Sequence, residues 1–145
     1  MTPTLLGRLQ TRWVLLATVG LAWVLAVGPT LPLAEPDAAR VRVVGVVTLA
    51  VTAVVGTFWE LLYHVAQQWR WDKDWPTLLG LVLGLPEGAA VYQLLVRGVP
   101  VDVGTITPAA FAWQFGTVWL FVWAMVSGPI RIVFPRWRFE GGRFW

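Results

Sequence analysis

The sequence predicts an all-α integral membrane protein, a bundle of four transmembrane helices in which neighbouring helices run antiparallel. Hydrophobic residues make up 57% of the 145 residues and charged residues 13%, and the mean hydropathy is +0.66. Soluble domains carry about 25% charged residues, so this chain falls outside their norm. Its apolar runs are long enough for bilayer spans, which need about 20 helical residues. At this length, we expect residues 1–145 to form a single four-helix transmembrane domain.

Composition also excludes several classes of function. The absence of cysteine excludes a disulfide framework, a thiol nucleophile, an iron–sulfur site and a thiolate zinc site. The net charge of +3 comes from basic residues at the ends of apolar runs, where membrane anchors lie, so the predicted partner is the lipid bilayer and not nucleic acid. The GxSxG and HExxH motifs, a phosphate-binding glycine loop and the EF-hand pattern are missing too. No catalytic residue is therefore predicted, and an enzyme is not the favoured class.

The first two helices are predicted from two apolar runs. The first covers about 13–33 and ends in a proline-rich turn, because proline lacks the N–H that a continuing helix needs. Arg8 and Arg12 before it resemble the start of a secretory signal, but we expect the helix to be retained. Asp37 is a suitable N-cap for the second helix, about 38–71. This run is rich in valine, but an open sheet in lipid would leave backbone polar groups unpaired, which favours a helix.

The third helix, about 75–96, is expected to kink at Pro86, because an interior proline removes one backbone hydrogen bond. That loss frees the carbonyl of Val82 to accept another bond. The fourth helix covers about 108–127. Arginine and aromatic residues alternate in 130–145, a mixture that is typical of an interfacial tail.

The distribution of lysine and arginine predicts the orientation. With four spans, both termini and the loop between the second and third helices lie on one side. Most of the 11 basic residues fall on that side, so we expect both termini to face the cytoplasm, with the protein integral to the cytoplasmic (inner or plasma) membrane. The residues on this side are Arg8, Arg12, Arg70, Lys73, Arg131, Arg136, Arg138 and Arg143; those on the other side are Arg40, Arg42 and Arg97.

Ionisable residues inside the apolar runs form the candidate site. Glu60 and Glu87 lie about equally far from the centre of the hairpin between the second and third helices, so we expect them at similar depth. His64 follows Glu60 by one helical turn on the same face. Charged groups at membrane depth cost several kcal/mol, so they face a bundle interior and have a partner.

Two carboxylates at one depth in a low dielectric cannot both ionise freely, so one holds a proton or both share a cation. We therefore predict an ion or proton site of Glu60, His64 and Glu87. In one form of this hypothesis, a protonated His64 supplies the positive charge. In another, Glu60, His64 and Glu87 are the three ligands of a divalent metal ion. A purely structural role, in which Glu60 and His64 satisfy each other, also fits. The candidate residues that support this site are Tyr63, Gln67 and Gln68.

Glycine recurs every fourth residue in the third helix, at Gly80, Gly84 and Gly88. Such a ridge lets another helix approach closely in lipid. Gly56 lies on the same face of the second helix as Glu60, so we expect the second and third helices to contact each other through these glycines.

Three functions fit these observations. The favoured one binds or conducts protons or small cations at the buried Glu/His site between helices two and three. Four helices rarely enclose a pathway alone, so conduction would need a homo-oligomer. The first alternative is a non-catalytic accessory subunit of a larger membrane complex. The second is a small membrane-embedded enzyme that uses a metal ion or an acid–base pair.

Overall fold

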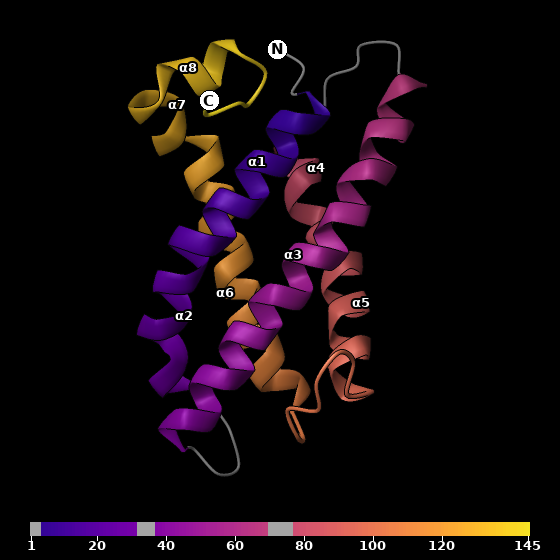
Figure 1. Cartoon of the computed structure of the whole chain (residues 1–145), viewed down its shortest axis with the longest axis vertical. Helices are drawn as coiled ribbons and strands as arrows, with labels where there is room; N and C mark the ends of the chain where they lie inside the picture. Colours follow the sequence, from indigo (N-terminus) through magenta and orange to yellow (C-terminus); the bar gives the residue numbers. More distant parts are fainter. Residues whose placement is uncertain (1–3, 32–36, 70–76) are drawn as a thin grey trace.

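A computed structural model describes residues 4–31, 37–69 and 77–145, and this part of the chain is helical apart from its turns and loops. It contains four helices long and apolar enough to cross a membrane. Figure 1 shows them side by side, with neighbours running in opposite directions and both chain ends at the same end of the bundle. The predicted fold class is confirmed. The four spans are Leu5–Thr30, Ala38–Gln68, Leu78–Val96 and Pro108–Val133.

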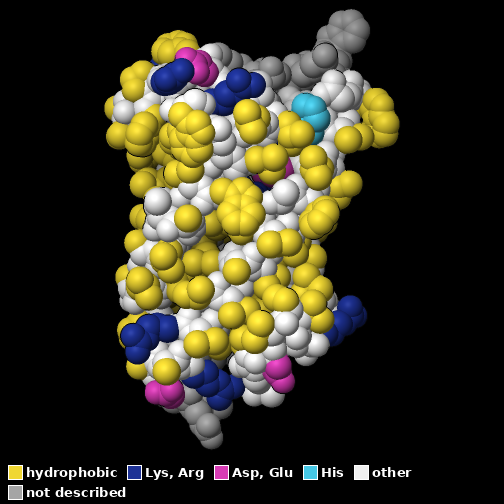
Figure 2. Space-filling view, in the orientation of Figure 1, with side chains coloured by type: hydrophobic (Ala, Val, Ile, Leu, Met, Phe, Trp, Pro, Cys, Tyr) yellow, Lys and Arg dark blue, Asp and Glu magenta, His cyan; other side chains and the backbone are white. Residues whose placement is uncertain are grey.

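The surface fits a membrane-crossing bundle. Figure 2 shows basic and acidic side chains gathered at the two ends of one face, with a largely apolar surface between them. Many large apolar side chains on the outside are exposed, among them Phe58 and Leu85. Outward-facing apolar residues in the middle and charged residues at the ends are what a bilayer requires. The protein is therefore an integral membrane protein by the hydropathy of its helices.

The first span starts earlier than the hydropathy pattern indicates. Thr4 caps it, since its hydroxyl accepts a hydrogen bond from the backbone N–H of Gly7 at 3.1 Å. Arg8 and Arg12 consequently lie inside the helix and not before it. The span consists of α1 (Leu5–Leu15), a π-helical turn η1 (Leu16–Gly20), α2 (Leu21–Val27) and a 3₁₀ turn η2 (Gly28–Thr30).

The second span is the single helix α3 (Ala38–Gln68). Asp37 is its N-cap, as predicted, and its carboxylate accepts a bond from the backbone N–H of Arg40 at 3.4 Å. The predicted ends of the adjoining helices fall partly on positions 32–33, 70–71 and 75–76, which lie outside the described residues.

The third span is interrupted, as Pro86 predicts. It consists of α4 (Thr77–Val82) and α5 (Gly84–Val96), and the break at Leu83 lies one turn before the proline. The ring of a proline clashes with the carbonyl four residues earlier, so a helix opens on its N-terminal side.

Side chains from the neighbouring helices bond to backbone carbonyls around this break. The Tyr63 hydroxyl of α3 donates to the carbonyl of Leu83 at 3.5 Å, and the Trp119 indole N–H donates to the carbonyl of Leu81 at 3.2 Å. An interrupted helix is tolerated at membrane depth when neighbouring groups satisfy its backbone in this way.

The fourth span consists of α6 (Pro108–Ser127) and the short helix α7 (Pro129–Val133), and another short helix, α8 (Pro135–Phe139), follows it. The chain then folds back onto α1. The Trp137 indole donates to the Thr11 hydroxyl at 2.7 Å, and that hydroxyl donates to the carbonyl of Gly142 at 3.0 Å. The tail that the sequence predicts at an interface is thus also bonded to the first helix.

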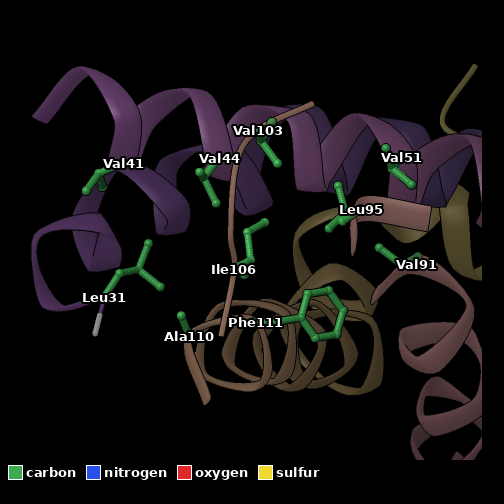
Figure 3. Packing of buried hydrophobic residues seen from close by; sticks show 10 residues of the cluster. All are labelled: Leu31, Val41, Val44, Val51, Val91, Leu95, Val103, Ile106, Ala110 and Phe111. Carbon is green, nitrogen blue, oxygen red and sulfur yellow. The ribbon is translucent and has the colours of Figure 1, made fainter. Parts of the chain in front are cut away.

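A buried apolar cluster fills the half of the bundle farther from the chain ends. Figure 3 shows that α3, α5, α6 and the loop before α6 all contribute to it. In α5, Glu87, Val91 and Leu95 are spaced by four residues and are the most deeply buried large side chains described. The stripe of α5 that carries the core therefore continues directly into the charged residue Glu87. The residues in Figure 3 are Leu31, Val41, Val44, Val51, Val91, Leu95, Val103, Ile106, Ala110 and Phe111.

Candidate functional site

Arg12 of α1 lies between two carboxylates, Glu60 of α3 and Glu87 of α5. Its Nε and Nη2 donate to Oε1 of Glu60 at 3.3 and 3.0 Å. Its Nη1 donates to Oε1 of Glu87, and its Nη2 to Oε2 of Glu87 at 3.1 Å. The exposed fraction of the side chain is 8% for Arg12, 15% for Glu60 and 0% for Glu87. Three of the four spans thus meet at one guanidinium.

Arg8 adds a second positive charge one helical turn from Arg12. Its Nη1 lies 3.7 Å from Oε2 of Glu60, and its Nη2 donates to Oε1 of Gln67 at 2.7 Å. Two arginines therefore face two carboxylates, and the charges balance. A buried ion pair persists when its remaining donors and acceptors are also bonded, a condition that these contacts largely meet. Arg8, Arg12, Glu60 and Glu87 together form the Arg12 cluster.

Small and aromatic residues shape the space around Arg12. A Cβ atom built on Gly56 would lie only 1.9 Å from Nη1 of Arg12, so the glycine leaves the room that the guanidinium occupies. The ring of Trp119 lies 5.6 Å from Cζ of Arg12, within the range of a cation–π contact. Gly56, predicted as a helix-packing residue, therefore packs against an arginine.

His64 does not belong to the cluster, so the expectation of a Glu/His site is wrong on this point. Its Nδ1 is buried and has no hydrogen-bond partner among the described residues. The positive charge comes instead from Arg12, which the sequence analysis placed ahead of the first helix. Of the supporting residues, Gln67 contacts Arg8 and Tyr63 bonds at the break in the third span, whereas exposed Gln68 donates to the carbonyl of His64 at 3.4 Å.

The described residues contain no group of three histidine, aspartate or glutamate side chains that could hold a metal ion. Glu60, His64 and Glu87 thus do not come together as the predicted set of three ligands. The guanidinium of Arg12 occupies the position between the two carboxylates that a shared cation would take.

The glycine ridge of the third span faces α6, not α3 as expected. A Cβ on Gly84 would lie 2.1 Å from Nε1 of Trp119, and one on Gly88 would lie 2.7 Å from Cε1 of Phe115. A Cβ on Gly80 would meet nothing within 4 Å. Two glycines therefore accommodate aromatic rings of α6, and the third borders open space.

That open space is a cavity of about 310 Å³. Residues of α1, α4, α6 and the C-terminal segment line it, and Arg12 and Glu60 form part of its wall. Glu87 is not among the lining residues. The two carboxylates that share Arg12 therefore differ in access, because Glu60 borders a cavity and Glu87 is sealed inside the bundle.

A second cavity, of about 10 Å³, lies next to the first. Polar residues in its wall include Thr48 and Gln114, whose amide donates to the carbonyl of Gly45 at 3.1 Å. The two cavities share the lining residues Leu16, Trp119 and Val122. Three large side chains thus border both the wide cavity and the small one, whose wall is mostly apolar.

Comparisons with protein-family models, characterised proteins and solved structures found no match. The main site residues that the sequence analysis missed are Arg8 and Arg12. Their spacing of four residues places them on one helical face, and two buried acids require positive partners, so a signal for them was present.

Proposed function

We propose that this multi-pass membrane protein binds and exchanges protons at Glu60, beside a fixed Arg12–Glu87 pair. The observation that carries the proposal is the unequal access of the two carboxylates. Glu87 is completely buried and bound by both terminal nitrogens of Arg12, whereas Glu60 borders the 310 Å³ cavity. A proton that reaches Glu60 through the cavity leaves both bonds between Arg12 and Glu87 in place.

A proton fits this position better than a metal ion. Hard cations such as Ca²⁺ take about six to eight oxygen ligands. Glu60 offers one carboxylate to the cavity, and its Oε1 already accepts two hydrogen bonds from Arg12. A proton needs a single oxygen and no coordination shell. Of the predicted species, protons or small cations, we therefore propose the proton.

Conduction across the membrane is a further step in this proposal. Beyond Leu16, Trp119 and Val122, the second cavity of about 10 Å³ holds at most one water. Transport therefore requires these side chains to move apart, or a second copy of the chain to complete the path in a homo-oligomer.

The proposed orientation places the cavity and both termini at the cytoplasmic side of the inner or plasma membrane. The charge distribution supports it, because most basic residues flank this end of the bundle. Glu60 would then exchange protons with the cytoplasm.

Infrared spectroscopy of the purified protein tests proton binding directly. The chain has only eight carboxyl side chains, so the band of a protonated carboxyl that appears on acidification can be assigned by substitution. We expect Glu60→Gln to remove one such band and Glu140→Gln, at an exposed position, to leave that band in place. If Glu60→Gln still shows every protonated-carboxyl band that the wild-type protein shows, the proposal is refuted.

A second measurement separates binding from transport. Proteoliposomes that contain a pH-sensitive dye would be given a potassium diffusion potential with an ionophore. Proton uptake that is lost in Glu60→Gln and kept in Glu140→Gln supports conduction. Infrared evidence for proton binding without uptake would limit the function to binding.

The two alternative functions stay predictions. An accessory subunit would purify in mild detergent as a metal-free monomer and would associate with a larger membrane complex. A membrane-embedded enzyme would use the same cavity for its substrate. Oligomeric state and metal content together would distinguish these cases from a homo-oligomeric conductor.

A further inference from the structure

We infer that the cavity beside Glu60 binds one acyl chain that carries an anionic head group, with the chain between α4 and α6 and the head group at Arg131. This inference does not depend on proton exchange at Glu60. It rests on the size of the cavity, the chemistry of its wall and its charge.

The size and wall of the cavity suit a single apolar chain. Its volume of about 310 Å³ lies at the lower end of the roughly 300–1,000 Å³ typical of small-molecule sites. Much of its wall is apolar or aromatic, with Leu15, Leu83, Trp119, Trp123 and Val126 as examples. Such a wall favours hydrocarbon by the hydrophobic effect. The space suits one chain better than both chains of a phospholipid.

Gly80 marks where the cavity meets the outside of α4. It is an exposed residue that lines the cavity, and a Cβ atom there would touch no neighbouring atom within 4 Å. A larger side chain at this position therefore fills cavity space without displacing the protein. Gly116 of α6 also has nothing within 4 Å and is exposed, but it does not line the cavity.

Charge selects the head group. The charged residues that line the cavity are Arg8, Arg12, Arg131 and Glu60. Within the Arg12 cluster the charges balance, because Glu87 completes it. Arg131 is exposed near the end of α7 and has no ion-pair partner in the ranges 4–31, 37–69 and 77–145. The cavity therefore carries one excess positive charge, and a guanidinium binds carboxylate and phosphate with two parallel hydrogen bonds.

Native mass spectrometry of the protein released from maltoside micelles tests this inference. The probes are dodecanoate, dodecyl phosphate, dodecanol and dodecyltrimethylammonium. We expect both anions to bind in a 1:1 ratio, dodecanol to bind at least roughly tenfold more weakly, and the cation not to bind. Equal binding of dodecanol and dodecanoate would overturn the assignment of an anionic head group.

Matched variants locate the site. Gly80→Leu should abolish binding of both anions, whereas Gly116→Leu should leave it unchanged. Arg131→Gln should reduce the affinity for the anions to that for dodecanol, whereas Arg143→Gln, an exposed arginine outside the cavity wall, should have no effect. A monodisperse gel-filtration profile confirms folding of each variant. Anion binding that survives both Gly80→Leu and Arg131→Gln would place the ligand elsewhere and refute the inference.

The anionic chain can belong to a phospholipid of the bilayer or to a free single-chain acid. A third experiment distinguishes these two sources. The protein would be reconstituted in nanodiscs of phosphatidylcholine with phosphatidylglycerol and then extracted. One phosphatidylglycerol retained by the wild type and lost in Gly80→Leu identifies a chain of an anionic phospholipid. Retention of added dodecanoate alone identifies a free single-chain acid. If Glu60→Gln loses proton binding but still binds the anionic chain as the wild type does, acyl-chain binding is independent of the proposed proton exchange.

Discussion

The guanidinium of Arg12 holds the carboxylate of Glu87 with two hydrogen bonds, from Nη1 to Oε1 and from Nη2 to Oε2. The Glu87 side chain is completely buried and has no access to the cavity. In the folded protein Arg12 is therefore the charged partner of a carboxylate that is completely buried. Removal of one partner of a buried ion pair leaves an uncompensated charge, which costs far more than the net contribution of the pair.

We predict that Arg12→Gln lowers the free energy of unfolding by about 3–5 kcal/mol. Arg12→Lys should recover only part of this loss, because an ammonium group cannot bond both oxygens of Glu87 in a fork and also reach Glu60. Thermal unfolding in detergent, followed by circular dichroism, measures both effects. Arg143→Gln is the control for loss of an exposed arginine.

A double substitution tests the reason for this loss. Arg12→Met combined with Glu87→Met removes both charges, so its cost should be much smaller than the sum of the two single changes. If Arg12→Gln unfolds at the wild-type temperature, or the two costs add, the buried pair does not organise the bundle.

The sequence predicts the two acids of the site but not their partner. Their equal distance along the sequence from the centre of the hairpin predicts that Glu60 and Glu87 lie at similar depth, and both contact Arg12. Arg12 was missed because hydropathy alone set the start of the first helix, and a charged residue does not extend an apolar run. Arg12 can be buried because two acids on other helices, Glu60 and Glu87, pair with it. No local sequence pattern predicts such a contact between separate helices.

The glycine ridge shows a similar limit. Four-residue spacing predicts a face of small residues but not the helix that packs on it. Phe115 and Trp119 in α6 have the same spacing, and their rings pack at Gly88 and Gly84. The fold-back of the tail onto α1 joins Thr11 to Trp137, far apart in sequence, and no local signal predicts such a contact.

The proposed orientation can be tested with single cysteines, because the natural chain has none. We predict that a membrane-impermeant maleimide labels Asp102→Cys in intact cells. Lys73→Cys should react only after the membrane is made permeable, since the positive-inside rule places residue 73 in the cytoplasm. The reverse labelling pattern would show that the orientation is opposite to the proposed one, with the cavity on the outer side of the membrane.

Gly84 and Gly80 lie one helical turn apart, yet we predict opposite effects of the same substitution. A Cβ on Gly84 would lie 2.1 Å from Nε1 of Trp119, whose N–H donates to the carbonyl of Leu81. Gly84→Ala must therefore displace a packed ring and strain this bond, at a cost of about 1–3 kcal/mol.

Gly80→Ala adds a methyl group where nothing lies within 4 Å. The change should be neutral or should stabilise the helix by up to about 1 kcal/mol, because glycine is a poorer helix former than alanine. Thermal unfolding of the two variants in one detergent compares them directly. If both substitutions destabilise the protein equally, α6 does not pack against Gly84 as described, and the ridge contacts another surface along its whole length.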